Sequence, residues 1–352
     1  PINKKELSIE NKGKVLYIDD EAEKGWFELF TYIIYDINQM DFVHLDEQFN
    51  EHSQVEIIDI CLEKIKSFDP ELVILDFRLH KSDLYNNIKE VTGYQILNKI
   101  KEFNKGIQVI IFSATNKIWN LQALQEAGSD GFIIKESPEN SVDPEFTIES
   151  IQNMIKSIDS SLGMMFLKEV CNNIDSIKLH LLNVSNDCDE KEFEKLLKMK
   201  FKNEIFIQLD IIYDCLKKSS IDISTIIKDE NSYLNLSFIS IFKIIELIND
   251  FYTNEKGDKL RSGRENIQNY DQNLNAFNNI TNQYPSTREK IMTIINFELN
   301  ESPIIFVSKI NQFIKFRNNI IHPKTLKDYK KTSKEENLEF LKLVKSILVK
   351  IK

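Results

Sequence analysis

The sequence has few cysteines, and it has no long apolar run. Its four cysteines (Cys61, Cys171, Cys188 and Cys215) form no CxxC pair and no metal-ligand pattern with histidine. This usage is typical of reduced thiols in a cytosolic protein. No apolar run is long enough to cross a bilayer, and no signal-peptide pattern opens the chain. We therefore expect a cytoplasmic protein without a membrane segment.

The chain also has no strongly basic stretch, and its charge is unevenly distributed. Residues 1–150 hold 15 Lys+Arg against 28 Asp+Glu, a net charge of −13, whereas the remainder carries +3. An acidic first half argues against nucleic-acid binding there, and the second half permits it without requiring it. With 352 residues, of which 42% are hydrophobic, the chain is long enough for two domains, each with its own core.

The strongest local pattern is the run Leu72-Val73-Ile74-Leu75, which Asp76 follows directly. Four consecutive apolar residues predict a strand buried on both faces. An unpaired carboxylate is too costly to place deep in a core. We therefore expect Asp76 at the carboxyl end of this strand, the edge at which open α/β sheets bind ligands.

Similar apolar segments alternate with amphipathic segments through the first half of the chain. This alternation predicts a parallel, doubly wound α/β sheet. The expected strands are Lys14–Ile18, Asp41–Leu45, Leu72–Leu75, Ile107–Phe112 and Gly131–Ile134, and the expected helices are Glu21–Asp36, Val55–Ser67, Thr92–Phe103, Lys117–Ala127 and one that begins near Phe146.

Polar residues follow four of these strands at their carboxyl ends: Asp19, Asp20, Asp76, Ser113 and Lys135. Three carboxylates at one edge repel each other unless a cation lies between them, and oxygen-only ligands suit a hard ion such as Mg²⁺. The lysine supplies a second positive charge, and the serine supplies a hydroxyl donor. Together these groups would stabilise phosphoryl oxygens beside a nucleophilic carboxylate.

This constellation resembles the receiver domain of two-component response regulators, over residues 14–159. The resemblance implies a flavodoxin-like fold with a five-stranded parallel sheet in the order 2-1-3-4-5, Mg²⁺ as cofactor and a histidine kinase as phosphodonor. By this match the site consists of Asp19, Asp20 and Asp76 as metal ligands, Asp76 as the phosphoacceptor, Ser113 as a phosphate contact, Lys135 as the invariant lysine and Phe132 as the switch aromatic.

The chain departs from the receiver pattern mainly in the loop that follows the phosphoacceptor. The segment from Asp76 to Gly93 is longer than usual, and Arg78-Leu79-His80 stands where a Met-Pro turn is common. We expect this loop to cover the site or to alter the choice of partner. His80 is expected to be a solvated loop histidine and not a catalytic one.

The second half reads as all-α. A nearly continuous helix from Phe146 to about Val184, with a bend at Gly163, leads into it without a flexible linker. The polar stretch 267–282 is expected to be partly helical. The predicted domains are an arm over 1–13, a receiver over 14–159 and an all-α effector over 160–352; the further helices are expected at Glu190–Lys217, Asn231–Tyr252, Pro285 onward, Ile304–Ile321 and Ser333 to about Lys352.

One segment of the second half carries candidate chemistry, with Arg317, Asn318 and His322 just before Pro323. Histidine moves protons near neutral pH and arginine stabilises a phosphorane, so the pair could cleave RNA without a metal. On a regular helix the two side chains would point roughly 140° apart, which favours a site shared by two copies. The alternative is structural: two cations at a helix C-terminus that the proline ends.

The pattern Arg-Asn-x-x-x-His late in a helical domain resembles the HEPN superfamily. That resemblance implies a metal-independent endoribonuclease of toxin or anti-phage type, which dimerises to complete its site and uses Arg317 and His322 as catalytic residues with Asn318 in support. We thus expect a response regulator in which phosphorylation of Asp76 controls a HEPN-like effector, with RNA as substrate and a homodimer as the active form. The alternative is a non-enzymatic signalling module whose helical half only dimerises or binds a partner protein. A DNA-binding regulator is disfavoured, because no helix-turn-helix pattern is evident.

Overall fold

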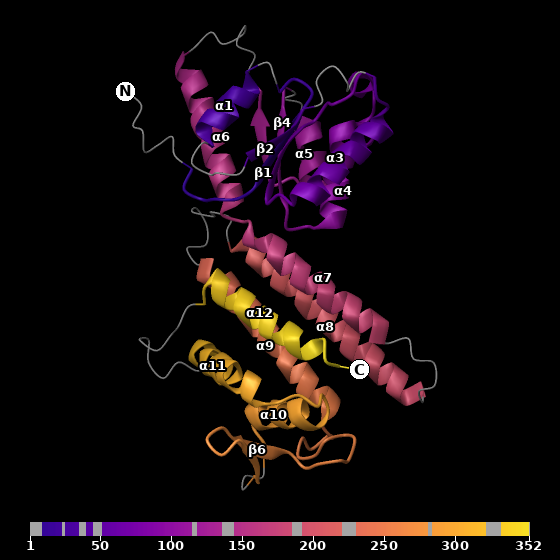
Figure 1. Ribbon diagram of the computed structural model, residues 1–352, viewed down its shortest axis with the longest axis vertical. Helices are drawn as coiled ribbons and strands as arrows, with labels where there is room; N and C mark the ends of the chain where they lie inside the picture. The colour runs from indigo at the N-terminus through magenta and orange to yellow at the C-terminus, as the bar shows by residue number, and fades with distance from the viewer. Residues whose placement is uncertain are drawn as a thin grey trace. The chain divides into compact units, whose positions relative to one another are not determined.

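The computed structural model describes residues 9–22, 25–34, 40–44, 51–114, 118–135, 144–184, 192–219, 230–280, 284–321 and 332–351. The chain divides into two compact units, Pro1–Cys171 and Asn172–Lys352 (Figure 1). Each unit is described by itself.

The first unit is built on a parallel five-stranded sheet in the order β2-β1-β3-β4-β5. Its strands are β1 (Val15–Asp19), β2 (Met40–His44), β3 (Leu72–Asp76), β4 (Gln108–Ser113) and β5 (Gly131–Ile134). This arrangement confirms the predicted fold class and strand order. The register pairs Ile18 with Leu75 and Asp76 with Phe112, so the carboxyl ends of the central strands lie level with each other.

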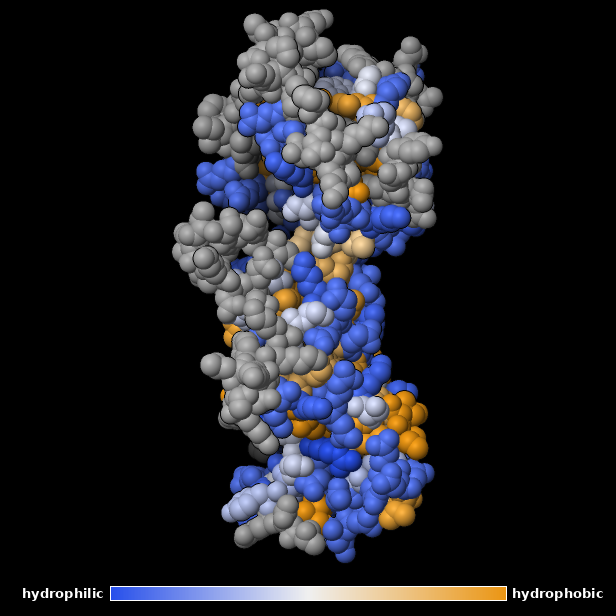
Figure 2. Space-filling view, turned by 90° about the vertical axis from the view of Figure 1, so that its left-hand side faces the viewer, coloured by the Kyte–Doolittle hydropathy of each residue, from blue (hydrophilic) through white to orange (hydrophobic). Residues whose placement is uncertain are grey.

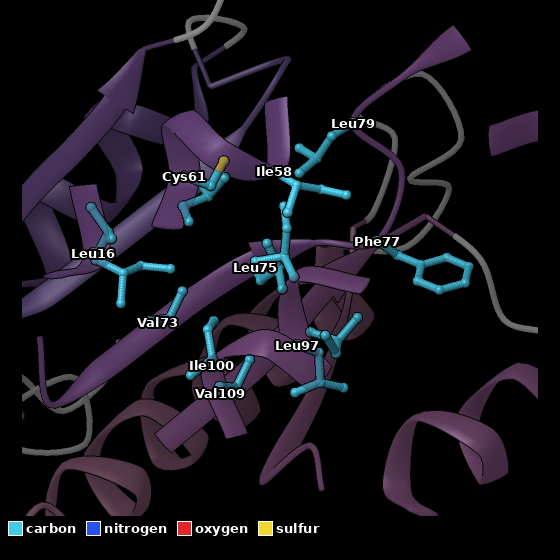
Figure 3. Close-up of a cluster of buried hydrophobic side chains, with 14 of the residues drawn as sticks. Leu16, Ile58, Cys61, Val73, Leu75, Phe77, Leu79, Leu97, Ile100 and Val109 are labelled. Carbon is cyan, nitrogen blue, oxygen red and sulfur yellow. The ribbon is translucent and has the colours of Figure 1, made fainter. Parts of the chain in front are cut away.

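Helices cover both faces of the sheet, because its strands alternate apolar side chains between the two faces. On one face, α3 (Gln54–Phe68) and α4 (Thr92–Phe103) pack over a cluster that Figure 3 shows in close-up. On the other face, α1 (Trp26–Ile33) and α6 (Pro144–Leu162) pack over a second cluster. The remaining helix, α5 (Ile118–Glu126), contributes Leu124 to the first cluster.

The long helix predicted from Phe146 to Val184 is two helices. Helix α6 ends at Leu162, and α7 (Phe166–Val184) begins after a turn that contains Gly163. The boundary between the two units falls within α7. Its first turn is fixed to the first unit, because Lys168 Nζ lies 2.7 Å from Asp69 Oδ1 and Asn104 Nδ2 donates to the Lys168 carbonyl at 3.2 Å.

The second unit is mostly helical. Besides the rest of α7, its helices are α8 (Glu192–Lys218), α9 (Glu230–Tyr252), α10 (Thr287–Phe297), α11 (Ile304–Ile321) and α12 (Lys334–Leu348). Phenylalanines from three of these helices form its core: the ring centroids of Phe313 and Phe340 are 4.4 Å apart, and Phe238 lies 5.0 Å from Phe313. The capping boxes at Ser286 and Ser333 begin α10 and α12.

The prediction of partial helix over 267–282 is wrong. This stretch forms an antiparallel hairpin of β6 (Gln268–Asp271) and β7 (Ala276–Asn279). The reason is turn chemistry: Asp271 Oδ1 accepts from the backbone N–H groups of Asn273 and Leu274, and Asn275 adopts a positive φ of 47°.

Among the described residues, no helix has both the length and the apolar character that crossing a membrane requires. The face in Figure 2 is mostly hydrophilic over the described residues, with hydrophobic areas of limited extent between them.

Candidate functional site

Three carboxylates meet at the carboxyl edge of the sheet. Strands β1 and β3 are neighbours, so Asp19 and Asp76 end side by side, and Asp20 follows at once. One carboxylate oxygen from each residue lies within 4.8 Å of the other two. Asp19 is 1% exposed and Asp76 is 6% exposed, whereas Asp20 is exposed to solvent. The result is an acidic site that is buried on one side and open on the other.

One lysine reaches into this site from the end of β5. Lys135 Nζ lies 2.6 Å from Asp76 Oδ2 and 2.7 Å from Asp19 Oδ2, and its side chain is only 8% exposed. The same ammonium group lies 5.2 Å from the centroid of the Phe112 ring. Within the described part of the chain, a single buried cation therefore faces the three carboxylates.

Burial and the neighbouring charges together shift the pKa values of these groups. Burial raises the pKa of Asp76 to about 7, with Asp19 and Asp20 adding to the rise and Lys135 opposing it. Burial and Asp19 together raise the pKa of Asp20 to about 6. Burial alone would lower the pKa of Lys135, but Asp76 and Asp19 outweigh it and the pKa is raised. Each shift has the sign expected where a further positive charge would be stabilising.

The donor set fits a divalent metal ion. All three groups offer carboxylate oxygen, which hard cations prefer, and no sulfur or imidazole ligand is present in the acidic cluster. The open side at Asp20 leaves room for water, which Mg²⁺ retains when it binds proteins. The site is thus consistent with divalent metal binding.

The two other predicted residues of this half lie on adjacent strands. Ser113 is the last residue of β4, is 3% exposed, and accepts a hydrogen bond on its carbonyl from Lys135 N at 3.0 Å. Phe132 lies on β5, half-buried against the hydrophobic cluster under α3 and α4. Ser113 therefore lies at the acidic edge, and Phe132 lies on the face of the same sheet that α3 and α4 cover.

Tyr17 is a site residue that the sequence did not reveal. It is fully buried on β1, and its hydroxyl donates to Asp19 Oδ2. Burial and the neighbouring carboxylates raise the pKa of this hydroxyl, so it stays a donor. In the sequence, a tyrosine in an apolar strand reads as core; the only available signal was its place two residues before Asp19, on the same face of the strand.

The long loop after Asp76 is ordered around two side chains. His80 is half-buried, and its Nδ1 accepts from Ser82 N at 3.2 Å, which caps the short helix η3 (Lys81–Leu84). His80 is therefore less solvated than expected, and its ring helps to order the loop. Asp83 is 3% exposed and is the second organising residue of this loop, which also was not anticipated.

The structure brings together only part of the second predicted site. Arg317 lies on α11, half-buried, with its guanidinium carbon 5.4 Å from the centroid of the Phe242 ring. Its Nη1 donates to Asn318 Oδ1 at 3.3 Å, and its Nε is buried with no hydrogen-bond partner in the described part of the chain. Asn318 is exposed. His322 lies outside the described residues.

Comparison with known proteins finds matches in the first half of the chain. The family model of the response regulator receiver domain matches residues 40–143. The nitrate/nitrite response regulator NarL of Escherichia coli K12 is 21% identical over 164 residues, which cover 44% of this chain and 67% of NarL. The chemotaxis protein CheY of Halobacterium salinarum is 28% identical over 91 residues, which cover 26% of this chain and 68% of CheY.

Solved structures give weaker likenesses. The receiver domain of NtrX from Brucella abortus superposes with a TM-score of 0.27 at 20% identity, covering 40% of this chain and 98% of that domain. A CheY-like receiver domain protein from Methanospirillum hungatei has a TM-score of 0.28 at 18% identity, and the match covers 41% of this chain and 94% of that protein. Against a longer NtrX chain, the match covers only 34% of that chain.

The chain therefore carries a response regulator receiver domain, followed by a mostly helical region. The family match begins at β2, whereas Asp19 ends β1 and Asp20 directly follows that strand. Because β1 pairs with both β2 and β3, Asp19 belongs to the same sheet as the matched strands.

Proposed function

We propose that this protein is a phosphorylation-controlled signalling protein of a two-component system, with Asp76 as its phosphoacceptor and a histidine kinase as its partner. The supporting observation is the carboxyl edge of the sheet, where three carboxylates lie within 4.8 Å of each other and a buried lysine contacts two of them. The receiver match implies a kinase of this class. The cytoplasm is the expected location of such a protein.

The proposed reaction is the transfer of a phosphoryl group from a phosphohistidine. An oxygen of the Asp76 carboxylate attacks phosphorus, the N–P bond of the phosphohistidine breaks, and the histidine nitrogen keeps the electron pair. Asp19, Asp20 and Asp76 would hold Mg²⁺, which supplies positive charge for the phosphoryl oxygens. Lys135 supplies a second charge from the protein and favours the ionised form of Asp76.

Two further residues complete the proposed switch. The Ser113 hydroxyl would donate to a phosphoryl oxygen once Asp76 is modified, because Ser113 ends the neighbouring strand β4 at the same edge. Phe132, on the next strand, would then change its packing. This change is the event that we propose passes the signal towards the helical region.

Intact-mass measurement after incubation with phosphoramidate and Mg²⁺ tests the proposal. The wild-type protein should gain the mass of one phosphoryl group, and Asp76→Asn should gain none. Asp69→Asn is the matched control: it removes a carboxylate just before β3, at the opposite edge of the sheet, and should be modified like the wild type. No gain in the wild type, or an equal gain in Asp76→Asn, would contradict the proposal.

For the helical region we propose a HEPN-like ribonuclease effector, completed by two copies of the chain and controlled by the receiver. The observation that favours it is Arg317, whose buried Nε is without a hydrogen-bond partner in the described residues, beside the exposed Asn318. A buried donor of this kind is usually satisfied, and an RNA phosphate could satisfy it.

An assay on total RNA separates this proposal from a non-enzymatic module. Wild-type protein should cleave RNA without added metal, His322→Ala should not, and Lys315→Ala, which changes an exposed residue of α11, should cleave normally. Equal or absent cleavage in the wild type and His322→Ala would support a helical half that only binds a partner. Light scattering with and without beryllofluoride and Mg²⁺ would test the dimer: a monomer in both conditions contradicts a shared site.

A further inference from the structure

The loop between β3 and α4 contains a buried carboxylate that takes no part in the acidic site. Asp83 is 3% exposed and accepts five hydrogen bonds. No cationic side chain among the described residues makes an ion pair with it. Burying a carboxylate is costly unless hydrogen-bond donors compensate the loss of water. The five donors therefore stabilise Asp83 in its buried position.

The donors come from three different segments of the receiver. Asp83 Oδ2 accepts from the backbone N–H groups of Leu79 and His80, both at 3.0 Å. Asp83 Oδ1 accepts from Thr92 N at 3.1 Å, from Thr92 Oγ1 at 3.0 Å and from Gln54 Nε2 at 2.8 Å. One carboxylate thus joins the segment that follows Asp76 to the first residues of α3 and α4.

The segment that Asp83 fixes also holds the phosphoacceptor carboxylate. Arg78 N, one peptide before Leu79 N, donates to Asp76 Oδ1 at 3.3 Å, while Asp76 Oδ2 faces Lys135. The orientation of Asp76 therefore depends on where the backbone runs between residues 77 and 80.

The start of α4 closes the same segment from the other side. Gly93, next to Thr92, donates from its N–H to the Phe77 carbonyl at 3.2 Å. A Cβ at Gly93 would lie 2.5 Å from the carbonyl oxygens of both Asp76 and Phe77. The backbone at Gly93 therefore lies directly against the Asp76 and Phe77 carbonyl groups, so the start of α4 restricts where this backbone can run.

We propose that Asp83 is a positioning residue for phosphoryl transfer to Asp76, an inference that rests on the proposed phosphoacceptor function. By fixing Leu79 and His80 against α3 and α4, Asp83 sets the Arg78 N–H that orients the Asp76 carboxylate. The loop that lengthens this receiver thus carries its own anchor and does not lie loosely over the site.

Asp83→Asn tests the inference directly. Asparagine has one acceptor oxygen, and its amino group cannot accept. In one orientation of the amide, the Leu79 and His80 N–H groups lose their acceptor; in the other, the Thr92 and Gln54 donors lose theirs. The initial rate of phosphorylation by phosphoramidate at saturating Mg²⁺, followed by intact mass, should fall about tenfold or more, because small misplacements of reacting groups are costly.

The matched control is Asp130→Asn, which removes a largely buried carboxylate at the opposite edge. Asp130 Oδ2 accepts from Lys101 Nζ and from Val109 N at 2.9 Å, so its loss should lower stability and leave the rate within about twofold of the wild type. Thr92→Val, a nearly isosteric change that removes one donor to Asp83, serves if Asp83→Asn does not fold. It should slow the reaction about twofold to fivefold.

The outcomes separate the two proposals. A wild type that gains no phosphoryl mass contradicts the phosphoacceptor function itself. A modified wild type with folded Asp83→Asn and Thr92→Val reacting at the wild-type rate contradicts the positioning role alone. Rates that fall equally in Asp83→Asn and Asp130→Asn, in proportion to their loss of stability, also contradict it.

Discussion

The two edges of the receiver sheet both carry buried charge, but they balance it differently. At the amino edge, where the parallel strands begin, Lys101 Nζ lies 2.5 Å from Asp130 Oδ2 and also donates to the Ile107 carbonyl at 2.6 Å. Lys168 there contacts Asp69 at 2.7 Å. At the carboxyl edge, one lysine among the described residues faces the three carboxylates of the acidic site.

This difference separates structural charge from functional charge. A buried ion pair with one partner of each sign is complete and needs no further ligand, whereas an excess of one sign stores unfavourable free energy that an incoming ion of opposite sign releases. Burial is the main cause of the raised pKa values of Asp76, about 7, and of Asp20, about 6, and the neighbouring carboxylates add to both rises. Two comparisons between the edges and two tests of the acidic site itself examine this interpretation, from the largest expected effect to the smallest.

The largest effect is expected from a comparison in which one lysine is removed at each edge, Lys135 or Lys101. Lys135→Met leaves the carboxylates of the acidic site without their protein cation, and phosphorylation by phosphoramidate should slow by about 10²- to 10³-fold, as when a transition-state charge partner is lost. Lys101→Met, at the amino edge, should keep the wild-type rate and lose about 3 kcal/mol of stability, because it removes the ammonium group that lies 2.5 Å from the buried Asp130 carboxylate. Rates come from intact mass and stability from urea unfolding.

Equal slowing in the two lysine variants would contradict the distinction between the edges. So would a Lys135→Met protein that reacts normally, because the acidic site would then be complete without its lysine.

A second comparison uses a glycine at each edge. A Cβ at Gly93 would lie 2.5 Å from the carbonyl oxygens of Asp76 and Phe77, and one at Gly106 would lie 2.2 Å from the Leu167 carbonyl oxygen. Because backbone atoms must move in both cases, each alanine variant should lose about 2 kcal/mol of stability. Only Gly93→Ala should also slow phosphorylation, by about tenfold.

The readout that matters here is the ratio of rate loss to stability loss, measured on the same preparations. Similar ratios for Gly93→Ala and Gly106→Ala would show that the loop after Asp76 has no special influence on the reaction.

The sequence predicted the strands and the residues at their ends better than it predicted the loops, and the reason is physical. Strand order, the burial of both faces and the convergence of Asp19, Asp76 and Lys135 follow from apolar runs and from the fact that parallel strands end at one edge. The anchors of the loops do not follow in this way. Asp83 binds donors nine residues later in the chain and 29 residues earlier, and no periodicity reports a contact of that kind.

The hairpin of the second unit was missed for a related reason. The stretch 267–282 is polar, so it carries neither the period of a buried helix nor that of a buried strand. Its conformation is decided by Asp271 and Asn275 in the turn. Tyr17 was missed for a different reason. It lies in the expected strand Lys14–Ile18, and an apolar ring in such a strand gives no sign that its hydroxyl contacts the acidic site.

The pH dependence of stability should show the raised pKa values of the acidic site. Asp76 and Asp20 hold protons in the folded protein over a range in which the unfolded chain has released them, because folding raises their pKa values from 3.8 to about 7 and about 6. The free energy of unfolding without metal should therefore fall as pH rises from about 4 to about 7. Mg²⁺ should oppose the fall by binding the folded state.

Asp20→Asn tests the cause of this slope. The variant should be more stable than the wild type by about 1 kcal/mol near pH 7.5 without Mg²⁺, a modest figure because the side chain is exposed and screened. It should also gain less from added Mg²⁺. Urea unfolding by circular dichroism gives both quantities, and a variant that shows the wild-type slope and the wild-type response to Mg²⁺ would contradict a shared acidic site.

The smallest effect is expected from Tyr17→Phe, which removes a single hydroxyl. That hydroxyl donates to Asp19 Oδ2, the oxygen that also faces Lys135. Its loss leaves Asp19 with one donor fewer and should change stability by about 1 kcal/mol. The more telling readout is Mg²⁺ affinity from fluorescence titration, since the Trp26 ring lies 4.9 Å from that of Phe112 near the site.

The direction of the affinity change decides what the hydroxyl does. If it only fills the core, Tyr17→Phe binds Mg²⁺ like the wild type, as Tyr270→Phe should, because that hydroxyl contacts Asn275 in the second unit. If it competes with the metal for Asp19, its removal tightens Mg²⁺ binding by about fivefold, the equivalent of one hydrogen bond. If it holds the carboxylate in place for the metal, binding weakens by a similar factor. We expect weakening, because Asp19 is 1% exposed and Tyr17, together with Lys135, fixes the same oxygen in the direction of Asp76.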